Sequence, residues 1–132
     1  MAQKQGKSSA DGGRLDGSNG TAVTTAAIAL GAGWGSSTFT VADGSTDQRG
    51  QMTITGVTGG GLAQATATIT FTFVDGAYAA TPWPQIRSTS NNTDIDTGRV
   101  KVGTRSTTGW VGTYSVLPVN AKVYIIDWKV VQ

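Results

Sequence analysis

The chain has 132 residues and a mass of 13.5 kDa, which is enough for one domain and too little for two. It contains no His, no Cys and no Glu, so all eight acidic residues are Asp. This composition excludes Ser-His-Asp and Cys-His nucleophiles, a Cys/His zinc site and disulfides within the chain. We therefore predict a protein that is not an enzyme and holds no cofactor.

The ten Lys and Arg residues exceed the acids by two, and they are scattered without any run. Nucleic-acid-binding proteins normally gather basic side chains on one face, among aromatic residues or glycines. No stretch approaches the roughly 18 apolar residues of a membrane span, and no apolar core follows the first lysines as it would in a signal peptide. We expect no nucleic-acid partner, no membrane and synthesis in the cytoplasm.

The first twenty residues are rich in Gly, Ser, Asp and Lys, with Leu15 as the one large aliphatic residue after the initiator Met. Such a segment cannot bury a core, so it is either a disordered tail or an extended arm on a neighbouring surface. Its basic residues, which would suit an acidic groove, are Lys4, Lys7 and Arg14.

Residues 21–30 are uncharged and rich in Ala, but they also contain several β-branched residues and no polar stripe at helical spacing. We interpret them as a strand or an extended docking segment, with a short helix as the alternative. The predicted organisation is an arm and docking segment at 1–33, followed by a β domain at 34–132.

From residue 34 onward, apolar and polar residues alternate with a period of two, which indicates strands. The clearest run is 65–73, where Ala, Ile and Phe alternate with threonines. The prolines of segment 81–84 remove backbone donors, so this segment cannot lie in the centre of a sheet. The other expected strands are 38–41, 52–55, 86–89, 99–102, 110–117 and 123–131, the last with Tyr124, Ile126, Trp128 and Val130 on its core face.

About eight short strands with turn signals every 8–12 residues are typical of an antiparallel β-sandwich or jelly roll. No alternation of strands with helices indicates a parallel sheet. We therefore predict an all-β fold of about eight strands behind an extended N-terminal arm.

The loop around Asp94 and Asp96 places two carboxylates two residues apart, a spacing that suits Ca²⁺. Asn and Asp also fill loops for reasons of turn geometry alone, so no metal site is assigned. Paired-Asp catalysis of the glycosidase kind is disfavoured, because most of the aspartates lie in turn-like contexts.

The four tryptophans could form a platform for sugars, although large aromatic residues more often fill cores or interfaces. Trp83 and Trp110 are the candidate exposed ligand aromatics, and Trp83 is the better one because prolines flank it.

The threonines of run 65–73 form a flat, uncharged surface, and the low content of charge leaves the strand edges unprotected. A closed homo-oligomer would cover both, although threonine-rich strands are also common on exposed surfaces. The candidate oligomer face is Thr66, Thr68, Thr70 and Thr72.

Three features together resemble a β-sandwich module of tailed-bacteriophage structural proteins. They are the turn Gly-Ser-Thr-Asp-Gln-Arg-Gly at 44–50, the alternating strand at 65–73, and the elements Tyr78 and Thr81-Pro82. The resemblance covers residues 34–89. Such modules resemble trimeric jelly rolls and occur as capsid decoration (cement) proteins, head-fibre bases and tail-fibre knobs.

The resemblance implies a homotrimer, and a free-standing domain with a short arm fits a decoration protein best. It would sit on the outer capsid surface of the virion, bind the major capsid protein and stabilise the shell. The expected capsid contacts are Lys4, Lys7, Arg14, Val23, Ile28 and Leu30. The alternative is a receptor- or carbohydrate-binding knob that recognises a host glycan through exposed tryptophans.

Overall fold

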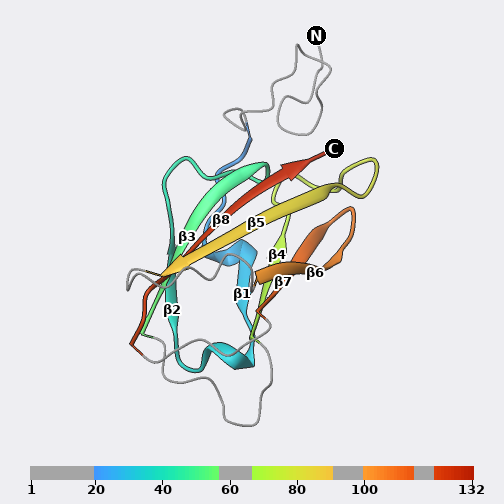
Figure 1. Ribbon diagram of the computed structural model, residues 1–132. Helices are drawn as coiled ribbons and strands as arrows, with labels where there is room; N and C mark the ends of the chain where they lie inside the picture. Colours follow the sequence, from blue (N-terminus) through green and yellow to red (C-terminus); the bar gives the residue numbers. More distant parts are fainter. Residues whose placement is uncertain (1–19, 57–66, 91–99, 115–120) are drawn as a thin grey trace.

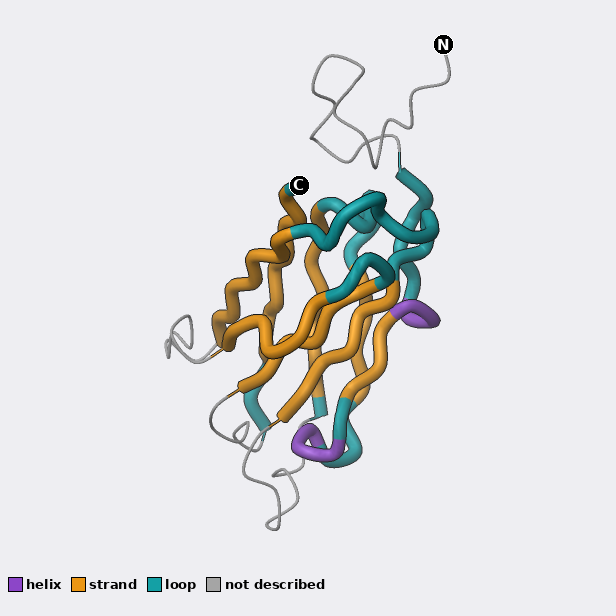
Figure 2. The backbone as a smooth tube through the Cα atoms, turned by 90° about the vertical axis from the view of Figure 1, so that its right-hand side faces the viewer, coloured by secondary structure: helices purple, strands orange, loops and turns teal. Residues whose placement is uncertain are grey.

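The computed structural model describes residues 20–56, 67–90, 100–114 and 121–132. Two antiparallel four-stranded sheets face each other in this part of the chain (Figures 1 and 2). The strands are β1 (Ile28–Leu30), β2 (Thr38–Val41), β3 (Arg49–Thr55), β4 (Ala67–Thr72), β5 (Trp83–Ser90), β6 (Val100–Arg105), β7 (Gly109–Tyr114) and β8 (Tyr124–Val131).

The strand order is β1-β4-β7-β6 in one sheet, here called sheet A, and β2-β3-β8-β5 in the other, here called sheet B. This arrangement confirms the predicted all-β, eight-stranded sandwich. The helical elements in the described ranges are two short 3₁₀ turns, η1 (Thr25–Ala27) and η2 (Ala32–Trp34). None of the helices found there is long and apolar enough to cross a membrane.

The core lies between the sheets and is formed by the alternate residues that the period of two predicted. Ile69 and Phe71 of β4 are buried, and so are the four predicted core residues of β8. Phe71 stacks on Trp110 at 5.0 Å and meets Trp128 of the opposite sheet edge-on at the same centroid distance. The contact of Phe71 with Trp128 joins the two sheets through their inner faces, whereas the stack on Trp110 lies within sheet A.

Strand β5 lies at the edge of sheet B, as its prolines require. It pairs with β8 alone, and Pro84 lies opposite Val130. A proline at an edge leaves no backbone donor missing inside a sheet. The strand is longer than expected, because Trp83 already pairs with Val131.

Residues 20–33 belong to the sandwich, which corrects the expected separate docking segment. The backbone N–H of Val23 donates to the carbonyl of Ser45, and β1 pairs with β4 at the edge of sheet A. Val23 and Ile28 are both buried in the core of this chain. Within the segment, the 3₁₀ turn Thr25–Ala27 is followed directly by the short strand Ile28–Leu30, so its sequence has no single period.

The loop that contains Asp47 links the two sheets. Asp47 is 1% exposed, and its carboxylate oxygens accept hydrogen bonds from the backbone N–H groups of Val74 and Asp75, each at 2.9 Å. Asp47 precedes β3 of sheet B, whereas Val74 follows β4 of sheet A. A Cβ on Gly50 would collide with the ring of Trp128, so the turn at 44–50 requires glycine at its end.

Candidate functional site

The outer face of sheet A is neutral except for Lys101, which lies on the outermost strand, β6, directly opposite Thr113. One row runs Ala29, Thr70, Val111 and Thr104, from β1 to β6. We call the whole surface the threonine face, and it consists of Ala29, Thr68, Thr70, Thr72, Thr104, Val111 and Thr113. Of the expected oligomer residues, Thr70 and Thr72 are exposed and Thr68 is half-buried, whereas Thr66 lies outside the described residues.

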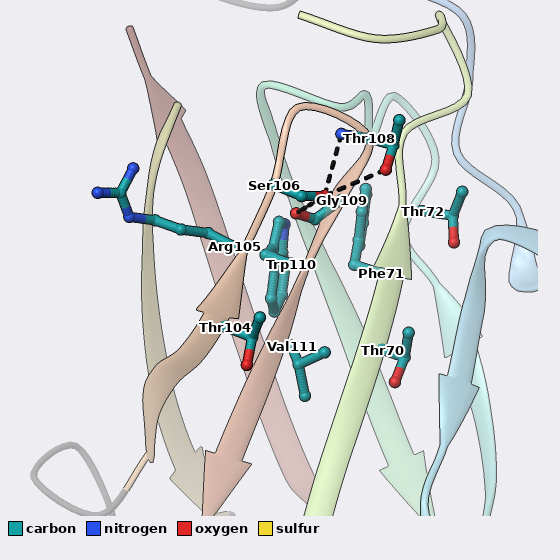
Figure 3. Close-up of a pocket in the computed structure, with 10 residues that line it drawn as sticks. All are labelled: Thr70, Phe71, Thr72, Thr104, Arg105, Ser106, Thr108, Gly109, Trp110 and Val111. Atoms are coloured by element: carbon teal, nitrogen blue, oxygen red, sulfur yellow. Dashed lines mark hydrogen bonds between the residues drawn. The ribbon is translucent and has the colours of Figure 1, made fainter. Parts of the chain in front are cut away.

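A depression of about 180 Å³ opens on this face above Gly109 (Figure 3). The hydroxyl groups of Thr70, Thr72 and Thr104 lie around it, and the turn of Ser106 and Thr108 closes one end. A Cβ on Gly109 would collide with the carbonyl oxygen of Phe71, so a side chain cannot fill the floor.

The depression offers neutral hydrogen-bonding groups rather than charge. The Ser106 hydroxyl oxygen accepts a hydrogen bond from the backbone N–H of Thr108 at 3.2 Å, which fixes the turn. Arg105 also borders the depression, but its side chain extends away from it (Figure 3). Hydroxyl groups can both donate and accept, so this surface can meet a partner without pairing charges.

The outer face of sheet B, by contrast, carries charge. Two outward-facing rows run Arg49, Lys129, Gln85 and Gln51, Asp127, Arg87 across β3, β8 and β5. The Asp127 carboxylate accepts hydrogen bonds from Gln51 Nε2 at 2.8 Å and from Arg87 Nη2 at 3.1 Å. We call this surface the charged face, and it consists of these six residues.

Trp83 stands at the end of the charged face. Its side chain is 61% exposed, and the guanidinium carbon of Arg105 lies 3.6 Å from the centre of its ring. Arg105 Nη1 also donates to the carbonyl of Pro82 at 3.0 Å. Because β5 and β6 lie side by side at one margin of the sandwich, Arg105 reaches from sheet A to sheet B.

The other three tryptophans are buried, so the expectation for Trp110 is wrong. Trp110 is 2% exposed and lies against Phe71 in the core. Trp34 and Trp128 are likewise core residues. Only Trp83 can meet a ligand without unfolding.

Of the six expected capsid contacts, the three that lie in the described part of the chain are buried or half-buried. Val23 and Ile28 are buried within this chain, so their side chains are not available to a shell protein. Leu30 is half-buried and packs against the same core. The three basic residues Lys4, Lys7 and Arg14 lie outside the described residues, as does the loop of Asp94 and Asp96.

Sequence reasoning missed Arg105 as a partner of Trp83, since nothing local to either residue indicates the contact. It also missed the buried group around Asp47, although the turn at 44–50 singled out that segment. Tyr78 lies nearby and is 4% exposed. Burial raises the pKa of its phenol above the usual range, and the Asp47 and Asp75 carboxylates raise it further.

In the described part of the chain, no group of three His, Cys, Asp or Glu residues could hold a metal ion. No protein-family model, no curated protein and no solved structure matches the chain. The candidate surfaces are therefore the threonine face of sheet A and the charged face of sheet B with Trp83.

Proposed function

We propose that this protein is a bacteriophage capsid decoration protein, which binds the outer surface of the head as a homotrimer and stabilises the shell. The observation that carries the proposal is the threonine face, a neutral surface that extends from β1 to β6 and has a single charged side chain, Lys101, at its margin. The resemblance of residues 34–89 to phage structural modules supports the choice of a phage particle and of threefold symmetry.

A neutral hydroxyl-bearing face is suited to burial between subunits. Charged side chains are depleted from the centres of protein interfaces, because each buried charge must be paired. Thr hydroxyl groups need only hydrogen bonds, and the methyl groups of Thr, Ala and Val supply apolar contact. Lys101, at the margin of sheet A beside Thr113, is exposed and would remain in solvent at the rim.

In a closed threefold ring, the threonine face of one subunit meets a different surface of the next. The trimer then carries three N-terminal arms, and Lys4, Lys7 and Arg14 of each arm would contact the acidic exterior of the shell. Once one arm is bound, the others bind at a high effective concentration, so three weak contacts give firm attachment.

The trimer is tested by placing one charge at the centre of the threonine face. Thr70→Arg should convert a trimer into a monomer, because the guanidinium would be buried without a partner. Thr40→Arg is the matched control, since Thr40 is an exposed outward-facing residue of β2 in sheet B. Native mass spectrometry measures the mass of the assembly that each variant forms, and circular dichroism confirms that both variants fold. Equal masses for the two variants would contradict the assignment of the interface.

The location is tested by cryo-electron microscopy of the parent particle. Density of this sandwich over the threefold positions of the shell is the expected result. The exposure of Trp83 favours a second candidate, the glycan-binding knob, which predicts density at the tail tip and no binding to purified capsids.

A further inference from the structure

The charged face of sheet B contains a depression of about 380 Å³, whose lining on β5 begins at Gln85, two residues along the strand from Trp83. Gln85 and Trp83 both point outward from β5 and are two residues apart, which places them about 7 Å from each other. The depression is lined by Gln85, Ile86, Arg87, Asp127, Trp128 and Lys129. An exposed aromatic ring thus adjoins a hollow with amide, ammonium, guanidinium and carboxylate groups.

Trp83 is held in place before any ligand arrives. Pro82 and Pro84 restrict the backbone on both sides, and Arg105 lies over the indole. Arg105 is itself fixed by its hydrogen bond to the Pro82 carbonyl. The ring nevertheless remains 61% exposed. An indole face carries partial negative charge and is attracted to the polarised C–H groups of a sugar ring, so a rigid exposed indole is a platform for stacking.

The groups around the platform are predominantly cationic. Among the described side chains of the charged face together with Arg105, four are cations and one, Asp127, is a carboxylate. A further carboxylate, that of Asp43, lines a neighbouring depression together with Arg49. Asp127 is already engaged by Arg87 and Gln51.

Arg49 and Lys129 lie directly opposite each other on β3 and β8. Within the described ranges, neither of them forms a salt bridge with a carboxylate. Like charges in this position destabilise a sheet, and a bound anion relieves the repulsion.

We propose that this site binds an acidic saccharide, with one sugar ring stacked on Trp83 and its carboxylate or sulfate directed toward Lys129 and Arg49. A single-stranded nucleic acid requires successive aromatic platforms, whereas this face has one. A protein interface of standard size requires an apolar centre, whereas among the described residues Val131 is the one exposed large apolar side chain paired with Trp83 in the sheet. The proposal rests on the charged face, and it does not depend on the decoration role.

The test is titration with hexagalacturonate and with a heparin-derived hexasaccharide, measured by calorimetry and by tryptophan fluorescence. Because three of the four tryptophans are buried, a change in the red-edge emission reports Trp83. Binding of at least one acidic probe should be about tenfold or more tighter than binding of neutral maltohexaose. Trp83→Ala and Lys129→Gln should each weaken binding by about tenfold.

The matched control is Lys101→Gln, which removes the same charge from sheet A and should leave binding unchanged. Failure of both acidic probes to bind at millimolar concentration would overturn the proposal. A second result would also overturn it: polyaspartate binds as tightly as the acidic saccharides, and Trp83→Ala does not weaken that binding. Such a result would identify a site for acidic peptides. The native mass of the protein is read in the same samples, so loss of the trimer is distinguished from loss of the saccharide site.

Discussion

The two sheets resemble each other in the side chains of their inner faces and differ in the side chains of their outer faces. Inside, both contribute large apolar side chains, such as Phe71 of sheet A and Trp128 of sheet B, which meet at a centroid distance of 5.0 Å. Outside, threonines cover most of sheet A, whereas sheet B combines threonines on β2 and β3 with a group of charged side chains across β3, β8 and β5. The inner faces determine the fold, and the outer faces are the surfaces to which we assign the two proposed kinds of binding.

This difference follows from the cost of removing each group from water. Hydroxyl groups can be buried against a partner when they keep hydrogen bonds, whereas charges such as Arg49 and Lys129 remain favourable only in solvent or beside an anion. The threonine face is therefore suited to a permanent interface between subunits. The charged face is suited to reversible binding of a ligand.

The largest expected difference in stability is between substitutions of a core tryptophan and of a surface tryptophan. Trp110→Ala should lower the free energy of unfolding by about 3–5 kcal/mol, because it empties the place of a ring that stacks on Phe71. Trp83→Ala should cost less than about 1 kcal/mol, since the side chain lies mostly in solvent. Urea unfolding followed by circular dichroism measures both. If the two substitutions lowered the free energy of unfolding by similar amounts, Trp83 would contribute to stability as a core residue does.

The next largest effect should come from the link between the sheets. Asp47→Ala removes the acceptor of two backbone N–H groups and should lower the free energy of unfolding by about 2–3 kcal/mol. Asp43→Ala, in the same loop but exposed, is the control and should have little effect. If chemical denaturation gives the same midpoint for both variants, Asp47 does not hold the sheets together.

The smallest effect should be on the charged face itself. Arg87→Ala breaks the ion pair with Asp127, but the Arg87 side chain is 68% exposed. The expected change in stability is below about 0.5 kcal/mol, because solvent screens such pairs. Thermal unfolding measures this change. A decrease of more than about 1 kcal/mol in the free energy of unfolding would show that the charged face contributes to the stability of the fold.

Alternation predicted the strands well because each sheet has one face in the core and one outside. Alternation alone could not show that the side chain of Trp83 is exposed and that of Trp110 is buried. Strand β7 has apolar residues in both phases, and only the pairing of Trp110 with Phe71 places its ring inside. Residues 21–30 allowed both a strand and a short helix for a related reason, and the structure contains both, a 3₁₀ turn at Thr25–Ala27 followed by a strand at Ile28–Leu30. The contact of Arg105 with Trp83 depends on two edge strands meeting, which no local pattern indicates.

The central claim is that the threonine face is buried between three copies of the chain. Native mass spectrometry of the wild-type protein at micromolar concentration tests it most directly. The account predicts a species of three times the 13.5 kDa chain mass, which Thr70→Arg reduces to one chain and Thr40→Arg leaves intact. A wild-type protein that remains monomeric at these concentrations would contradict it.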